Sequence, residues 1–470
     1  MKSVILMSAV LCSSICILRA ETVILTPATA VRTAGPAQAA PPATAVQPAS
    51  IARPAQPATT AQPAKGEMPF MITYWCGPSK AETNLERYKE LADCGFNVAF
   101  PAIDNLWEPA SKTQELHNLK VLDLCQKVGM KALIWDGSIT NVGTWSTAPK
   151  PEESPKIEKT LDGLISKYSR NPAFLGFVLG DEGNSAEGNL RLGVVNQYLA
   201  KKDPKHLAYF NLLPSYAYGF LHGQDYEKFI VDYIRDAKPP YVSWDHYRQM
   251  FEGGDESLYW SNLEIVRKHC LAAKIPYIQI IVSIKHMGYR ECSEADLRWQ
   301  VWTSLAYGSR GITYFTYCHV PGMAWGDAPA LLTKDGRRDA KWGYVQKINH
   351  RIAKLGPTLV KLTSTGVYCT DPLPPGTQGL SADAPVAKAE GGPMAIGCFK
   401  DPMGKVYMMV VNRSLGGQIN AKLTMQPKVS STAEVSQETG KLLPPAMLKN
   451  KILDVPLEAG EGRLFALSIR

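Results

Sequence analysis

The chain has 470 residues, of which 45% are hydrophobic, 20% are charged and 9% are aromatic. This composition is typical of a globular protein with a large buried core, and it excludes a coiled coil, a collagen-like chain and a mostly disordered protein. The formal net charge is +8, and half of it lies in residues 1–66, so the rest of the chain is nearly balanced. The charge therefore gives no sign of a nucleic-acid partner.

Residues 1–20 predict an export signal. Lys2 precedes an apolar run over residues 4–18, and Ala20 offers a cleavage site, with Ala30 as the alternative. The run is about 15 residues long, which is short for a membrane span and typical of a signal-peptide core. We therefore expect a mature chain without a transmembrane segment, exported to the periplasm, the cell surface or the exterior. A lipid anchor and the oligomeric state stay open.

Residues 21–66 are rich in Ala and Pro, contain repeated Gln-Pro-Ala triplets and include no aromatic residue. Such a segment cannot bury enough apolar surface to offset its chain entropy, so we expect a disordered linker. The eight cysteines that follow form no Cys-x-x-Cys pair, which argues against a zinc or dithiol site. Most of them lie in apolar segments, so we expect buried free thiols.

Residues 67–360 alternate between short apolar runs and helical patterns. The runs predict strands at 71–76, 97–101, 131–136, 174–180, 207–213, 241–246, 277–284 and 311–317. The patterns between them predict helices at 81–94, 116–128, 157–168, 190–199, 226–237, 258–273, 294–307 and 342–355. Continuous apolar strands suit a parallel sheet that is covered on both faces, and eight strand–helix units make a (β/α)8 barrel. A doubly wound sheet is the alternative, but no Gly-x-Gly-x-x-Gly follows the first strand.

Residues 361–470 follow a different pattern. Short strand-like runs at 394–399, 406–411, 421–425 and 433–436 are separated by turn signals such as Asp401-Pro402-Met403-Gly404. The pattern predicts a C-terminal antiparallel β-sandwich domain, which would either brace the barrel or bind carbohydrate.

The active site of a barrel lies where its strands end, so the residues at those ends indicate the chemistry. They combine aromatic rings with acids, an amide and histidines: Trp75, Asp104, Trp135, Asp136, Asp181, Asn211, Trp244, His246, Tyr247, His286 and Tyr317. Sugar rings stack on aromatic faces, and their hydroxyls need polar partners. A carbohydrate substrate is therefore expected, with no cofactor and no metal, although any single one of these residues could instead belong to the core.

Asp181 and Glu182 give the most specific signal, because two acids directly follow an apolar strand and are flanked by glycines. Unpartnered carboxylates in such a place would be costly, so a function is the simplest explanation for them. Glu182 is predicted to be catalytic.

Three motifs carry a resemblance to a known family. Leu-Gly-Asp-Glu-Gly-Asn at 179–184, Asn211 and Ser-Trp-Asp-His-Tyr at 243–247 resemble the barrel clan of retaining β-glycosidases, in which an acid/base glutamate follows strand four. The segment 294–317 is similar to β-galactosidase-like members and their secreted relatives, which also carry a C-terminal β-domain. The resemblance covers about residues 68–470. It implies an O-glycoside hydrolase with Glu182 as its acid/base residue.

The chain departs from that clan at the end of strand seven, where the clan has its nucleophilic glutamate. Here Lys285 and His286 follow the strand. Asp245, which ends strand six, is the best-placed second acid, and the other candidates are Asp136, Glu291, Glu294 and Asp296. Ser293 and Asp296 also have the spacing of a helix capping box, which needs no catalytic role. Retention and inversion both stay open, because they differ in the carboxyl separation.

Two further hypotheses follow from the missing acid. The first is a non-catalytic carbohydrate-binding protein on a degenerate glycosidase barrel, since fold alone does not establish activity. The second is a metal-dependent enzyme that uses Asp245, His246 and His286, although the spacing of these residues is not diagnostic.

Overall fold

The computed structural model describes residues 68–247, 250–251, 256–320 and 327–470. The predicted signal peptide and the Ala/Pro-rich segment lie outside these ranges, so both stay predictions. Across the described residues, no helix has the length and apolar character needed to cross a membrane.

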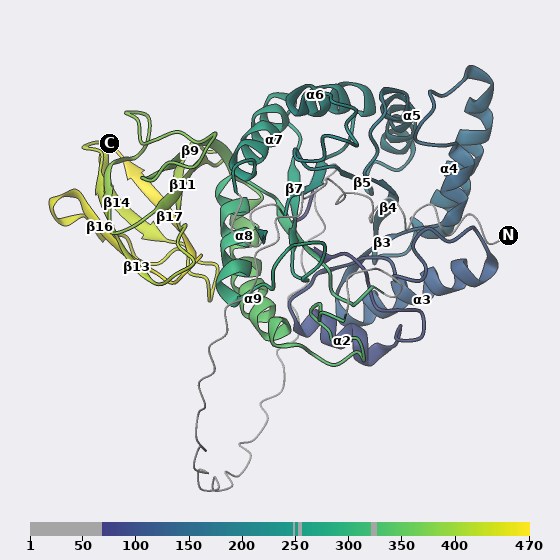
Figure 1. Ribbon diagram of the computed structural model, residues 1–470, viewed down its shortest axis with the longest axis horizontal. Helices are drawn as coiled ribbons and strands as arrows, with labels where there is room; N and C mark the ends of the chain where they lie inside the picture. Colours follow the sequence, from purple (N-terminus) through teal and green to yellow (C-terminus); the bar gives the residue numbers. More distant parts are fainter. Residues whose placement is uncertain (1–67, 248–249, 252–255, 321–326) are drawn as a thin grey trace, which may run out of the picture. The chain divides into compact units, whose positions relative to one another are not determined.

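Eight parallel strands form a nearly closed barrel, as the sequence predicts (Figure 1). Neighbouring strands are hydrogen-bonded in the order β1-β8-β7-β6-β5-β4-β3-β2. Their bounds are β1 Met71–Tyr74, β2 Val98–Ala99, β3 Lys131–Ile134, β4 Phe174–Asp181, β5 Leu207–Leu212, β6 Val242–Asp245, β7 Tyr277–Val282 and β8 Gly311–Phe315. The sequence located all eight because strands covered on both faces read as continuous apolar runs.

The seam between β1 and β2 is bridged by backbone hydrogen bonds from Asn97 to Ile72 and from Gly77 to Pro101, and by the Asn97 side chain. The Asn97 side chain accepts a hydrogen bond from the Ile72 amide at 2.8 Å and donates one to the Phe70 carbonyl at 2.8 Å. Beyond it, a Cβ atom on Gly77 would lie only 2.6 Å from the Phe100 carbonyl oxygen, so glycine is required for this approach. These contacts hold β1 and β2 side by side although β2 is only two residues long.

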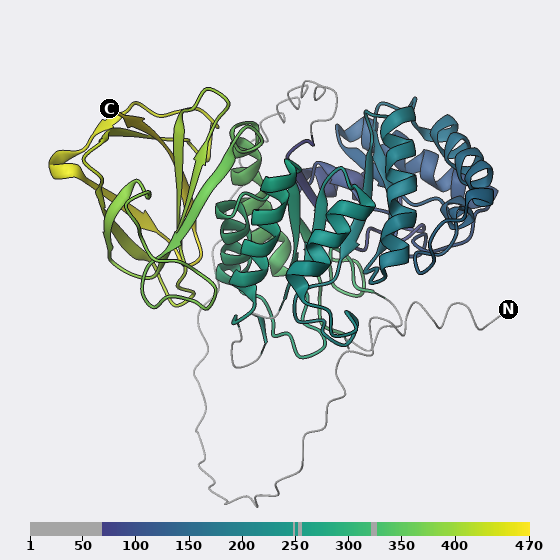
Figure 2. The same ribbon diagram turned by 90° about the horizontal axis from the view of Figure 1, so that it is seen from above.

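Helices follow the strands and cover the outside of the barrel (Figures 1 and 2). They are α2 Leu85–Asp93, α3 Lys112–Val128, α4 Ser154–Tyr168, α5 Ala186–Lys202, α6 Tyr226–Ala237, α7 Tyr259–Ala273, α8 Glu294–Ala306 and α9 Ala340–Leu359. Several begin at a side chain that accepts a hydrogen bond from the first turn, such as Asn84 and Ser111. The predicted capping box of Ser293 and Asp296 is confirmed.

The C-terminal residues form two antiparallel sheets that make a sandwich-like domain (Figure 2). Its strands are β9 Thr363–Cys369, β10 Val386–Glu390, β11 Met394–Lys400, β12 Val406–Asn412, β13 Ile419–Met425, β14 Val429–Glu434, β15 Ala446–Met447, β16 Ile452–Leu457 and β17 Gly462–Ile469. One sheet has the order β15-β14-β17-β12-β11-β9 and the other β10-β13-β16. Buried residues from both sheets, including Met408, Val410, Leu423 and Val455, make up its core.

The C-terminal domain packs directly against α8. The Arg298 Nε donates to the Ala459 carbonyl at 2.8 Å, and the Trp299 Nε1 donates to the Arg413 carbonyl at 3.1 Å. Gly397 of β11 approaches the helix so closely that an added Cβ would lie 2.2 Å from the Ala306 carbonyl oxygen. The two parts of the structure therefore share one closely packed interface.

The eight cysteines after the signal segment are all buried and free, which confirms the prediction of buried thiols. Burial raises the pKa of the thiols of Cys94, Cys125 and Cys318. These groups stay protonated at neutral pH and serve as small core residues.

Substituting Gly397 tests the interface with α8. Gly397→Ala should lower the free energy of unfolding by about 1–3 kcal/mol, because the new methyl group forces the strand away from the helix. Gly417→Ala is the matched control, since an added Cβ there would meet no atom within 4 Å. Denaturant unfolding of both variants measures the difference. Equal stabilities would show that the close approach at Gly397 does not constrain the fold.

Candidate active site

The end of β4 places two acids where the strand ladder stops. Asp181 is the last residue of β4, and the Glu182 amide donates to the Asn211 carbonyl on β5 at 2.9 Å. Glu182 then adopts a left-handed conformation with φ of 49°. The chain therefore turns sharply at the acid that the sequence predicts to be catalytic.

The flanking glycines make room for a neighbouring ring. A Cβ atom on Gly180 would lie 2.6 Å from Cε2 of Phe210, and one on Gly183 would lie 2.8 Å from its Cζ. Packing of the Phe210 ring thus accounts for the glycines on both sides of the acid pair.

Asn211 links two carboxyl groups that come from different strands. Its Nδ2 donates to Oδ1 of Asp181 at 3.1 Å and to Oδ1 of Asp245 at 3.0 Å. The Ser243 Oγ donates to the Asn211 Oδ1 at 3.2 Å, which fixes the orientation of the amide. Asp181, Asn211 and Asp245, each singled out in the sequence, therefore form one hydrogen-bonded group, with Glu182 next to it in the chain.

The three acids have raised pKa values, for different reasons. Burial raises the pKa of Asp181 to about 7, and burial together with the charge of Asp181 raises that of Asp245 to about 7; hydrogen bonds from Asn211 oppose both shifts. Burial, then Asp181, then Asp245 raise the pKa of Glu182 well above its usual value. Asp181 also has solvent-exposed surface, so water can reach it although protein atoms lie close around its carboxyl. Near neutral pH the three acids thus hold at least one proton.

A layer of polar and aromatic side chains supports this group from inside the barrel. The Trp75 Nε1 donates to the Tyr209 hydroxyl at 2.8 Å, and the Ser243 Oγ lies 3.4 Å from the same hydroxyl. The rings of Trp75 and Phe100 are 4.5 Å apart. Trp75, predicted to bind substrate, is thus a buried residue below the acids.

Aromatic rings surround the acids on the side of β6 to β8. Tyr247 stacks on Phe315 with ring centroids 5.6 Å apart, and the hydroxyls of Tyr216 and Tyr289 are 2.8 Å apart. Burial raises the pKa of Tyr247, and the charges of Asp245 and Glu182 add to the shift, so this ring lies near the acids. Tyr289 and Phe315 are absent from the sequence prediction, although they follow strand seven and end strand eight.

His286 and His246 lie among these rings. His286 is 5.3 Å from Phe315 between ring centroids, and burial lowers its pKa to about 4, so its imidazole is neutral at neutral pH. His246 is fully buried, with its ring 4.9 Å from that of Tyr216. Among the residues that the structure describes, no three His, Cys, Asp or Glu side chains are arranged to hold a metal ion.

The remaining predicted site residues are engaged elsewhere. The rings of Trp244 and Tyr317 have no exposed surface, and the Tyr317 hydroxyl donates to Glu90 on α2 at 2.6 Å, so neither ring offers a face to a sugar. Trp135 is buried and donates from Nε1 to the Glu108 carbonyl at 3.1 Å. Asp104 is exposed and accepts from the Lys80 amide at 2.8 Å.

Asp136 and the other candidate acids have structural partners. Burial alone would raise the pKa of Asp136, but hydrogen bonds from Tyr168 and Ser138 outweigh it and hold the value low. The other candidates form ion pairs with basic residues: Glu291 with Lys341, Glu294 with Arg298 and Asp296 with Arg290. Of the proposed second acids, Asp245 is the one that shares a hydrogen-bond donor with Asp181.

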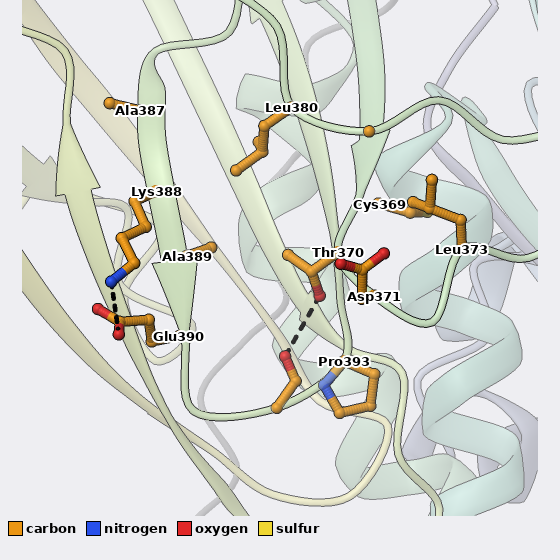
Figure 3. Close-up of a pocket in the computed structure, with 12 residues that line it drawn as sticks. Cys369, Thr370, Asp371, Leu373, Leu380, Ala387, Lys388, Ala389, Glu390 and Pro393 are labelled. Carbon is orange, nitrogen blue, oxygen red and sulfur yellow. Dashed lines mark hydrogen bonds and ion pairs between the residues drawn. The ribbon is translucent and has the colours of Figure 1, made fainter.

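A separate pocket of about 580 Å³ lies in the C-terminal domain, between the β9–β10 connection and β10 (Figure 3). Asp371, Lys388 and Glu390 are among the residues that line it, and Lys388 and Glu390 pair at 2.8 Å. Its twelve described lining residues include no aromatic side chain, so the pocket offers no ring on which a sugar could stack.

The raised carboxyl pKa values predict that stability falls with rising pH. A folded pKa near 7 exceeds the unfolded value of about 4, so the folded chain binds more protons, and its stability decreases as the pH rises between those values. Asp245→Asn should flatten this decrease, because an amide does not ionise. Thermal unfolding at pH 5 and pH 8 measures it, with Asp104→Asn at an exposed site as the control. A wild-type pH dependence in Asp245→Asn would contradict the shift.

Comparison with models of known protein families and with curated proteins finds no match. A family 42 β-galactosidase structure from G. stearothermophilus, a catalytic mutant, has a TM-score of 0.58 at 10% identity, over 87% of this chain and 99% of that one. A glycoside hydrolase family 5 structure from Bacteroides vulgatus has a TM-score of 0.50 at 12% identity, over 85% and 89%. The chain covers 59% of a β-galactosidase from the psychrophilic Marinomonas ef1, with a TM-score of 0.45, 9% identity and 59% of this chain aligned. The chain therefore has a (β/α)8 glycosidase-like fold.

Proposed function

We propose that the chain is an exported glycoside hydrolase that cleaves O-glycosidic bonds of an oligosaccharide or polysaccharide. The observation that carries the proposal is the group of three acids at the ends of β4 and β6, with at least one proton held near neutral pH. Glycoside hydrolysis requires two carboxyls in different protonation states, one as acid and one as nucleophile or base. The glycosidase-like fold and the export pattern of residues 1–20 support the substrate class and the location.

In this reaction Glu182 is the general acid. Its proton passes to the glycosidic oxygen while the bond from that oxygen to the anomeric carbon breaks. Asp245, in its ionised form, either bonds to the anomeric carbon or takes a proton from the water that does so. If Asp245 bonds to the anomeric carbon, water then displaces it from that carbon and gives a proton to Glu182, so both carboxyls regain their starting protonation. If Asp245 instead takes the proton from water, it ends protonated and Glu182 ends ionised, and proton exchange with the solvent restores the starting state. In both cases the water oxygen ends on the sugar. Burial, together with repulsion from Asp181 and Asp245, raises the pKa of Glu182 and so keeps it protonated, as a general acid requires.

Replacing Glu182 tests its role directly. Glu182→Gln should lower kcat by about 100- to 10,000-fold, since an amide cannot transfer a proton to the leaving oxygen. Release of the aglycone from a panel of nitrophenyl glycosides, together with reducing-end assays on polysaccharides, measures this. Glu187→Gln, at an exposed position on α5, should keep wild-type activity. Full activity in Glu182→Gln would remove this residue from the mechanism.

Replacing Asp181 tests the electrostatic control of Glu182. Asp181→Asn removes a negative charge that raises the pKa of Glu182, so this pKa should fall. The decrease of kcat/KM at high pH, where the general acid loses its proton, should then begin at a lower pH than in wild type. The amide oxygen can still accept from Asn211, so the fold should persist. An unshifted alkaline limb would show that Asp181 does not act on the acid.

A carbohydrate-binding protein without catalysis is the second candidate function. It is favoured by the end of β7, where Lys285 and His286 follow the strand and no acid stands. Wild-type protein that binds one of the panel glycans by calorimetry, but forms no product from any of them during long incubation, would establish this function instead.

A further inference from the structure

Asn211 has no donor left for a substrate. An amide nitrogen carries two hydrogens, and both are directed to carboxyl oxygens, one of Asp181 and one of Asp245. Its side-chain oxygen accepts from Ser243, and its backbone oxygen accepts from the Glu182 amide at 2.9 Å. The residue is only 3% exposed. These contacts leave no amide hydrogen of Asn211 for a sugar hydroxyl, so they favour a different role for this residue than the predicted one.

The same hydrogen bonds connect three neighbouring strands of the barrel. Asp181 ends β4 and Asp245 ends β6, and β5 lies between these strands. The Asn211 amide keeps the Oδ1 atoms of the two carboxyls within the combined length of its two hydrogen bonds, so they stay close together even when both are ionised. Across the described residues, Asn211 is the one side chain whose hydrogen bonds lower the pKa of both carboxyls.

We propose that Asn211 is the positioning residue of the site, whose amide holds the carboxyls of Asp181 and Asp245 in one arrangement across β5 while its carbonyl fixes the start of Glu182. The assignment rests on the proposed function, because it concerns the same three acids. Asn211 touches no substrate in this scheme. It determines where the reacting carboxyl of Asp245 stands and how readily that carboxyl stays ionised.

Among the residues that the structure describes, the other titratable groups whose pKa these acids shift are tyrosines. They are Tyr209 on β5, Tyr216 after β5, Tyr226 on α6 and Tyr247 after β6. Burial raises the pKa of each, so all four stay neutral in the range where the acids titrate. The pH dependence of the acid group therefore reports on the acids and on the Asn211 amide.

Asn211→Ala tests the assignment through kinetics. The expected result is a fall in kcat of about 100-fold with little change in KM, because the acids are misplaced while the sugar contacts persist. Without the two donors, the pKa of Asp245 rises, so the acidic limb of the kcat profile moves to higher pH. Asn196→Ala is the matched control: Asn196 is equally buried, but its amide donates to the Ala237 carbonyl at 2.7 Å. Asn196→Ala should lower the stability of the protein but leave kcat, KM and the pH profile unchanged.

A second measurement does not depend on activity. Loss of the donors raises the folded pKa of Asp181 and Asp245 further, so the decrease in melting temperature from pH 5 to pH 8 should be steeper in Asn211→Ala than in wild type or Asn196→Ala. If Asn211→Ala does not fold, Asn211→Ser, which keeps one donor, should show an intermediate slope. Wild-type pH dependence in these variants would overturn the assignment. A wild-type protein that hydrolyses no glycoside would instead overturn the proposed function, and the stability comparison would still decide the role of Asn211.

Discussion

The closeness of carboxyl groups at the ends of β4 and β6, with Asp245 buried, is the constraint on which the rest of the site depends. An ionised carboxylate inside a protein costs several kcal/mol unless donors or opposite charges face it. Here the relief comes from two N–H groups of one amide and from protons retained near neutral pH. The same relief leaves an acid able to give a proton at the mouth of the barrel. The energetic cost of placing these carboxyls together and their ability to donate a proton therefore have the same cause.

The barrel geometry explains why these side chains meet. Side chains alternate along a strand, so Tyr209 and Asn211 of β5 face the interior together, as do Ser243 and Asp245 of β6. Hydrogen bonds join these two pairs in successive layers, from the Tyr209 hydroxyl through Ser243 to the Asn211 amide. Each acid is held by residues one layer below it or one strand away. The site thus needs no long loop to set the position of Asp181 or Asp245.

The sequence identified the barrel and the acids, but it could not say which way each strand-end side chain faces. Parallel strands covered on both sides have apolar residues at every position, so no alternation marks the inner face. Trp244 illustrates this, because it stands between Ser243 and Asp245 and points away from them into the helix layer near Tyr277. For the same reason the sequence did not identify Phe315 as a residue of the site. In the C-terminal domain, β10 was missed because most of its residues are exposed and give no apolar signal.

The close packing of α8 makes the surface of the barrel depend on the C-terminal domain. Trp299 and Trp302 of this barrel helix are covered by the C-terminal domain, since the Trp299 Nε1 donates to the Arg413 carbonyl and a Cβ on Gly462 of β17 would lie 2.8 Å from the Trp302 ring. A nascent chain that ends after α9 has made every strand of the barrel and still leaves these two indoles without their cover. Full burial of the barrel surface at α8 therefore depends on the C-terminal domain, and removing that domain would expose both indoles to water.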